Sequence, residues 1–282
     1  MPYLMHIAFD NTMRLTRAVH YFQYSGVRFK LIQNNPRKWS DVLLTVLESS
    51  SLPAEQRAYA AAGEFLSALA WHIHSPIALR PIGGMGVRQG FTLRQARCRI
   101  FHFPRVPWKG HHTGSLMSQI ADIENADQRL ALALFREARS ANKVHLSILL
   151  YWQIMEIRNG DAIGWANKMQ VRRPRGLHLP DDRIKRLPLQ GRRLGEYLQD
   201  DCRHAIAHIR RSPGKRRLRF DDVEDEGRLM TSSYVLEELA RYYIRTELGL
   251  TGTRYLVRRR GRGFPEYVDQ KTLGAGWYVV VR

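Results

Sequence analysis

The sequence predicts an α+β protein, in which a mixed α/β N-terminal region is followed by a mostly α-helical bundle and a short β-rich C-terminal tail. Residues 20–33 are rich in aromatic and β-branched types, which are typical of strands. Residues 126–141 and 143–158 consist instead of strong helix formers. We therefore place a mixed domain at 1–112, a helical domain at 113–250 and a C-terminal extension at 251–282.

The N-terminal domain alternates between the two kinds of element. In residues 20–33 the pair Ser25-Gly26 interrupts the pattern and favours a hairpin or a bulged strand. Residues 54–73 contain an Ala-rich run that follows a proline, so we expect a helix that begins there. Gln95–Phe103 favours a further strand, and the Pro- and His-rich stretch 104–114 is the best candidate for a linker.

The helical domain is predicted from apolar faces that repeat at helical spacing. In 143–158 one face holds Val144, Ile148, Tyr151, Trp152 and Met155. In 192–211 the apolar stripe consists of Leu194, Leu198, Cys202, Ala205, Ile206 and Ile209. Further helices are expected at 161–169 and at 223–248, the latter ending before a glycine. Together with 126–141, these segments predict an antiparallel bundle of four or five helices.

The composition excludes several classes of protein. With 44% hydrophobic residues the 282-residue chain can bury a core, so global disorder is excluded. Its two cysteines, Cys98 and Cys202, are too few for a disulfide-stabilised fold and fit a reducing compartment. The N-terminus lacks the basic region of a signal peptide, and no apolar run is long enough to span a membrane. We therefore expect a cytoplasmic protein with no membrane partner.

The chain is strongly basic, with 45 Lys+Arg against 26 Asp+Glu and a formal net charge of +19. Residues 171–219 hold fifteen of the cations and five of the acids, whereas residues 65–121 hold seven cations and no acid. Such an excess attracts polyanions, chiefly nucleic acid. An arginine-rich, solvated surface without a ligand is the alternative.

The most informative stretch of the chain is Asp200–His208, with the sequence DDCRHAIAH. It places Arg203 five positions before His208, with His204 directly after the arginine. Imidazole titrates near neutral pH and a guanidinium binds phosphate bidentately, so this pair suits acid–base and phosphate chemistry. The spelling resembles the R-x(4–6)-H signature of the HEPN superfamily (higher eukaryotes and prokaryotes nucleotide-binding).

The surroundings of the motif extend this resemblance. A helix with an aromatic-plus-acid ending, Tyr151–Glu156, precedes the motif in the chain, as in Apea-like HEPN domains. More narrowly, residues 114–250 resemble the methylamine-utilization protein J (MauJ-like) group. The resemblance implies a metal-independent endoribonuclease that works as a homodimer without a cofactor, with two motifs lining one cleft. It also implies that His208 activates the ribose 2′-hydroxyl and Arg203 stabilises the phosphorane, while His204 orients or assists.

Two alternatives follow from the local chemistry of the motif. At about 100° per residue, Arg203 and His208 lie about 140° apart on a regular helix. They converge only if the helix bends or ends there, or if a dimer partner supplies one of the two groups. His204 and His208 share a face with Asp201, which leaves a metal site of these three residues open. A purely structural role, in which Arg203 and His208 complement a helix C-terminus and neighbouring acids, is the other alternative.

We expect RNA or another nucleic acid as the partner, bound by cations on either side of the motif. The candidate binding residues are Arg172, Arg173, Arg175, Arg192, Arg193, Arg210, Arg211, Lys215, Arg216 and Arg217. Two competing hypotheses remain: binding of nucleic acid without cleavage, and a catalytically silent HEPN accessory or assembly protein of the methylamine-utilization type. The identity of any protein partner stays open.

Overall fold

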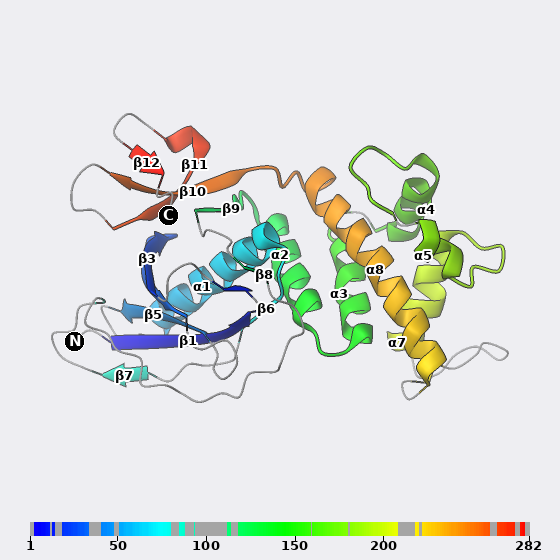
Figure 1. Cartoon of the computed structure of the whole chain (residues 1–282), viewed down its shortest axis with the longest axis horizontal. Helices are drawn as coiled ribbons and strands as arrows, with labels where there is room; N and C mark the ends of the chain where they lie inside the picture. Colours follow the sequence, from blue (N-terminus) through cyan, green and yellow to red (C-terminus); the bar gives the residue numbers. More distant parts are fainter. Residues whose placement is uncertain are drawn as a thin grey trace. The chain divides into compact units, whose positions relative to one another are not determined.

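The structure is a computed structural model of the chain (Figure 1). It describes residues 3–11, 13–14, 19–33, 41–47, 51–79, 85–87, 93, 112–113, 118–158, 160–179, 181–207, 218–219, 222–259, 264–273 and 277–279. The strand predicted at Gln95–Phe103 and most of the linker expected at 104–114 lie outside the described residues. The chain forms two compact units. Unit 1 comprises Met1–Ile123 and Thr251–Arg282, and unit 2 comprises Glu124–Leu250.

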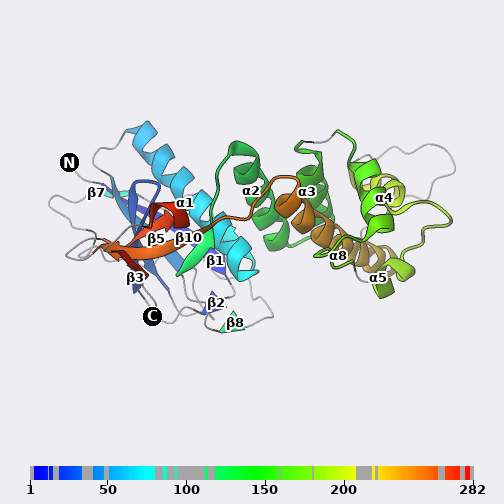
Figure 2. The same ribbon diagram turned by 90° about the horizontal axis from the view of Figure 1, so that it is seen from above.

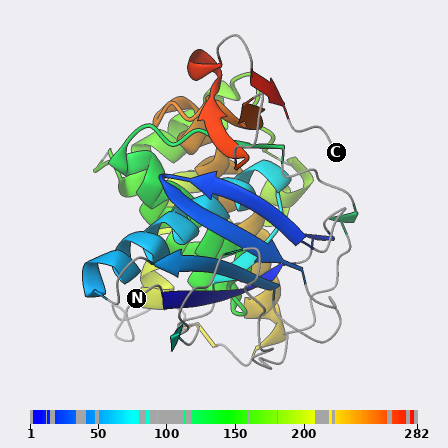
Figure 3. The same cartoon turned by 90° about the vertical axis from the view of Figure 1, so that its left-hand side faces the viewer.

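Unit 1 is built on one mixed β-sheet, to which ten strands belong within the described part of the chain. Eight of them follow in the order β12-β10-β11-β3-β4-β5-β1-β6, while β7 pairs with β1 and β9 pairs with β10. The strands are β1 Tyr3–Asn11, β3 Val19–Tyr24, β4 Val27–Ile32, β5 Asp41–Leu47, β6 Ile77–Leu79, β7 Met85–Val87, β9 Gln119–Ala121, β10 Thr253–Arg259, β11 Glu266–Asp269 and β12 Trp277–Val279. Figure 3 looks onto this sheet, in which β3 and β11 pair in parallel and the other paired strands are antiparallel. A separate parallel pair joins β2 (Met13–Arg14) to β8 (His112–Thr113).

The β3–β4 hairpin confirms the prediction for residues 20–33. Its two turn residues, Ser25 and Gly26, have φ angles of 47° and 76°. Positive φ at both central positions is the geometry of the tight hairpin turn that matches the twist of the flanking strands. Glycine adopts this geometry without steric strain, which explains why the pattern breaks at this dipeptide.

Helix α1 (Leu52–Ile73) packs on the sheet and buries an aromatic cluster. It carries Pro53 in its first turn, as the sequence predicts. The ring centroid of Phe65 lies 4.4 Å from that of Phe22 in β3 and 5.7 Å from that of Tyr267 in β11. These contacts join residues from the first quarter of the chain and from near its end in one core.

The described strands of residues 251–282 belong to the unit 1 sheet and do not form the separate extension that the sequence predicts. β10 pairs with β9, and β11 pairs with β3 through Glu266 and Gln23. These pairings satisfy backbone groups at strand edges that would otherwise be exposed. The unit boundary therefore falls after Ile123 rather than at residue 113.

Unit 2 is helical, as predicted, and its long helices lie near the expected ranges (Figure 2). Its elements are α2 Ala126–Ser140, α3 Val144–Glu156, α4 Ala162–Arg172, α5 Asp181–Arg186, α6 Leu194–Tyr197, the π-helix η1 Leu198–Arg203, α7 His204–Ala207 and α8 Val223–Thr246. Three helices begin at capping side chains. Asn125 accepts a hydrogen bond from the Gln128 amide in α2, and Asp161 and Asp222 act in the same way for α4 and α8.

The core of unit 2 lies mainly between α3 and α8. Of the apolar face predicted for 143–158, Ile148, Tyr151, Trp152 and Met155 are buried and Val144 is half-buried. α8 contributes Leu229, Val235, Leu236, Leu239, Ala240, Tyr243 and Ile244 to this core. Within the described parts of the chain, no helix is both long and apolar enough to cross a membrane.

Candidate functional site

The motif lies on a continuous helical segment made of α6, η1 and α7, residues 194–207, which we call the motif helix. This helix begins in contact with α4. Its first amides donate to side chains of that helix: the Leu194 amide to Gln170 Oε1 at 3.0 Å and the Gly195 amide to Asn167 Oδ1 at 2.7 Å. The Glu196 carboxylate accepts from the Arg193 amide at 3.1 Å. Amides at a helix start have no partner within the helix, so these contacts fix where the motif helix begins.

The motif helix is not a regular α-helix. Leu198–Arg203 form a π-helix, and the His204 amide donates to the Gln199 carbonyl five residues earlier. Single π-turns within α-helices are rare and occur frequently at functional sites. We call Leu198–Arg203 the π-turn. The rotation of 100° per residue that a regular α-helix has therefore does not hold within the π-turn, whose last residue is Arg203.

The apolar stripe predicted for this helix faces the core. Leu194, Leu198, Cys202 and Ala205 are buried and Ile206 is half-buried, while Ile209 lies outside the described residues. Burial raises the pKa of the Cys202 thiol above its ordinary value. It also raises the pKa of the Tyr197 hydroxyl to about 12. Both groups therefore stay neutral near pH 7.

Arg203 reaches toward the end of α3. Its Nη2 atom lies 3.8 Å from Glu156 Oε1, and the same carboxylate oxygen accepts a hydrogen bond of 2.7 Å from the buried Trp152 indole. The aromatic-plus-acid ending of α3 thus orients the guanidinium. With 31% of its side chain exposed, Arg203 remains accessible to an anionic ligand as well.

His204 is held by two side chains of the π-turn. Its Nε2 atom lies 2.7 Å from Gln199 Nε2, and its Nδ1 atom lies 3.6 Å from Asp200 Oδ1. The side-chain amide of Gln199 and the Asp200 carboxylate thus contact the two ring nitrogens of His204 from within the same turn. The imidazole is 39% exposed and oriented, which suits a group that assists proton transfer.

His208 lies outside the described residues, as do Arg210, Arg211, Lys215, Arg216 and Arg217. Of the predicted catalytic residues, the structure therefore places Arg203 and His204, at the end of the π-turn and directly after it. The alternative metal site of Asp201, His204 and His208 includes His208, whose position the structure does not describe. Its first member, Asp201, forms an ion pair with Arg192. In the residues for which the structure gives positions, no group of three His, Cys, Asp or Glu side chains could hold a metal ion.

The five remaining predicted binding cations lie on two stretches of unit 2. Arg172 and Arg173 are at the end of α4 and Arg175 follows them, all exposed. Arg173 pairs with Asp181. Arg193 is exposed just before α6, whereas Arg192 is half-buried in its pair with Asp201.

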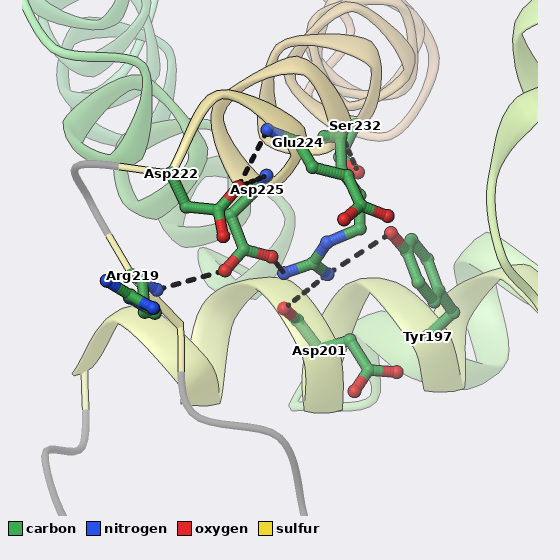
Figure 4. Close-up of polar contacts among 8 residues, drawn as sticks. Tyr197, Asp201, Arg219, Asp222, Glu224, Asp225 and Ser232 are labelled. Carbon is green, nitrogen blue, oxygen red and sulfur yellow. Dashed lines mark hydrogen bonds and ion pairs between the residues drawn. The ribbon is translucent and has the colours of Figure 1, made fainter.

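Sequence reasoning missed part of the basic surface and a buried ion pair. α5 adds Arg183, Lys185 and Arg186, and the Arg183 guanidinium lies 3.8 Å from the ring centroid of Tyr234. In α8, the guanidinium of Arg228 contacts the carboxylate of the buried Asp225 and reaches the motif helix (Figure 4). An acid and a base three positions apart in a charged helix carry no sequence signal of burial.

Comparison with known families bears on this part of the chain. Residues 131–245 match the family described as methylamine utilization protein MauJ. The matched segment runs from α2 into α8 and includes the π-turn, Glu156 and Arg228. This MauJ match supports the resemblance to the MauJ-like group and covers less than half of the chain. No curated protein and no solved structure matches the chain.

Proposed function

We propose that unit 2 is a HEPN-like domain that binds RNA and cleaves it as a metal-independent endoribonuclease. Arg203 and His208 carry the chemistry at the cleft of a homodimer, with His204 assisting. The observation that carries the proposal is the π-turn, which ends at Arg203 and directs its half-exposed guanidinium toward Glu156, with His204 next in the chain.

The reaction is a transesterification within the RNA backbone. His208 accepts the proton of a ribose 2′-hydroxyl, the 2′ oxygen bonds to phosphorus, and the bond from phosphorus to the 5′ oxygen breaks. The leaving 5′ oxygen takes up a proton, so the products carry a 2′,3′-cyclic phosphate and a 5′-hydroxyl. Arg203 stabilises the charge that develops on the phosphoryl oxygens, and no step requires a metal.

The environment of Arg203 favours this role over a purely structural one. The Arg203–Glu156 pair spans 3.8 Å between partners that are 31% and 37% exposed, and a pair of this kind contributes little to stability. Among the described residues, the Glu156 carboxylate is the ion-pair partner of this guanidinium. A phosphate can then be bound by other N–H groups of the same fork.

The experiment is an assay on labelled RNA in the presence of EDTA, with wild type, H208A and R203A. Wild type is expected to cleave, and H208A is expected to lose about 100-fold or more in rate, the usual contribution of acid–base catalysis. The matched control is H178A, since His178 is an exposed histidine of the same unit outside the motif. Intact RNA with wild type on several substrates, or equal cleavage by H208A, overturns the nuclease.

A second candidate is a catalytically silent accessory or assembly protein, which the description of the matched family favours. In a host that depends on this protein for growth on methylamine, the two candidates predict different results. A silent accessory protein restores growth equally well with wild type and with H208A. A nuclease restores it only with His208 intact, provided that both proteins accumulate to the same level.

A further inference from the structure

A buried ion pair joins α8 to the π-turn (Figure 4). Arg228 Nη1 lies 3.1 Å from the main-chain oxygen of Asp201 and 3.4 Å from the Tyr197 hydroxyl oxygen. Arg228 Nη2 donates to Asp225 Oδ1 at 3.3 Å. The Asp225 side chain is 1% exposed and that of Arg228 is 19% exposed, so both charges are largely removed from water.

The second oxygen of Asp225 holds another segment of the chain. Asp225 Oδ2 accepts a hydrogen bond of 3.0 Å from the Arg219 amide. In sequence, Arg219 follows the stretch 208–217, which carries His208 and five of the predicted binding cations. One ion pair therefore contacts the backbone on both sides of this stretch, at Asp201 before it and at Arg219 after it.

The Asp201 carbonyl that Arg228 contacts lies inside the π-turn, where the helix departs from α geometry. A helix deviates from α geometry where a side chain inserts into the ladder of main-chain hydrogen bonds. The guanidinium of Arg228 donates to a carbonyl inside the π-turn, two residues before Arg203. Packing alone does not require a buried ion pair, because apolar side chains of similar size are often as stabilising.

We propose that Arg228 and Asp225 are positioning residues, which hold the π-turn at Asp201 and thereby set the place of Arg203 opposite Glu156. The consequence for RNA cleavage rests on the proposed function. The consequence for the geometry of the turn does not.

The chain offers a matched control in the same helix. Arg241 is 15% exposed and pairs with Glu237 at 3.0 Å, four positions earlier. Its guanidinium lies 5.5 Å from the ring centroid of Phe135 in α2, so it faces a different neighbour from Arg228. R228Q and R241Q each remove one half-buried charge from α8, and only R228Q removes the contact with the π-turn.

The first measurement is the reactivity of Cys202, a fully buried thiol inside the π-turn. In a C98S background Cys202 is the remaining thiol, and its rate of reaction with a thiol reagent reports opening of the turn. R228Q is expected to react at least about tenfold faster than R241Q, and R228K, which keeps a charged donor, to react more slowly than R228Q. Equal rates in R228Q and R241Q overturn the positioning role.

The second measurement is RNA cleavage by the same variants. A displaced catalytic group costs up to about 100-fold, so R228Q is expected to lower kcat by tenfold or more with little change in KM, while R241Q stays near wild type. R203A combined with R228Q is expected to be no slower than R203A alone, since Arg228 acts through Arg203. Additive losses contradict the proposal. Absence of cleavage by wild type overturns the proposed function instead, and thiol reactivity then decides the positioning role alone.

Discussion

Gly195 lies in close contact with α4, and its substitution by alanine tests how tightly the motif helix packs there. A Cβ atom at this position would lie 2.3 Å from the main-chain oxygen of Ile163 and 2.9 Å from Asn167 Oδ1. The first of these atoms belongs to the backbone of α4, so it cannot move aside as a flexible side chain would. The start of the motif helix has to shift instead.

The expected loss follows from this overlap. Inserting a methyl group into a packed contact typically costs about 1–3 kcal/mol, and we expect G195A to lower the free energy of unfolding by that amount. The control is G227A in α8, where an added Cβ meets no atom within 4 Å. Alanine in a helix interior is better than glycine by about 0.5–1 kcal/mol, so G227A is expected to stabilise.

Urea denaturation of the two variants measures both effects, with unchanged slopes indicating that the folded and unfolded states are otherwise comparable. α6 continues directly into the π-turn, so the shift in G195A also displaces Arg203. RNA cleavage by G195A is therefore expected to fall more than cleavage by G227A. A G195A protein as stable as wild type would refute the close packing of the motif helix on α4.

Two further predictions concern charge and pH. RNA affinity is expected to fall steeply as the salt concentration rises. Replacing the exposed cations Arg172, Arg175 and Arg193 by glutamine is expected to reduce the slope of log K against log salt by about 2. Filter binding across a salt series measures this slope, and a flat slope for wild type contradicts the prediction. For Cys202, the pKa is raised in the folded state, so the unfolded thiol ionises first and stability is lost as the pH rises through its ordinary value of 9.0. C202A is expected to lose part of this pH dependence in denaturation experiments between pH 7 and pH 10, and an identical dependence in both proteins would argue against it.

Local patterns accounted for much of the fold. The Ser25-Gly26 turn, the helix formers of 126–141 and the apolar face of 143–158 act through neighbours a few positions away, so the sequence alone predicts them. The placement of β10 and β11 depends on pairing with β9 and β3, which are distant in the chain. Such pairing is set by tertiary contacts and leaves no local pattern.

In the candidate site, too, local patterns could be predicted from the sequence and tertiary contacts could not. Arg203 and His204 were found because they belong to a short motif. The π-turn has no local pattern that predicts it, and the contact from Arg228 to the Asp201 carbonyl inside it comes from another helix. The pairing of Arg203 with Glu156 likewise depends on how α3 packs, although the aromatic-plus-acid ending of that helix had pointed to it.

The pairing of β9 with β10 has a consequence for biosynthesis. The chain leaves unit 1 after β9 and re-enters it at β10, where the Asp122 amide donates to the Gly252 carbonyl and Arg254 pairs with Asp122. Unit 2 is thus an insertion whose two ends are fastened to each other. Residues 124–250 leave the ribosome before β10 and β11 are made, so the helical unit can fold first. The unit 1 sheet, in contrast, is completed only when the last strands of the chain have been made.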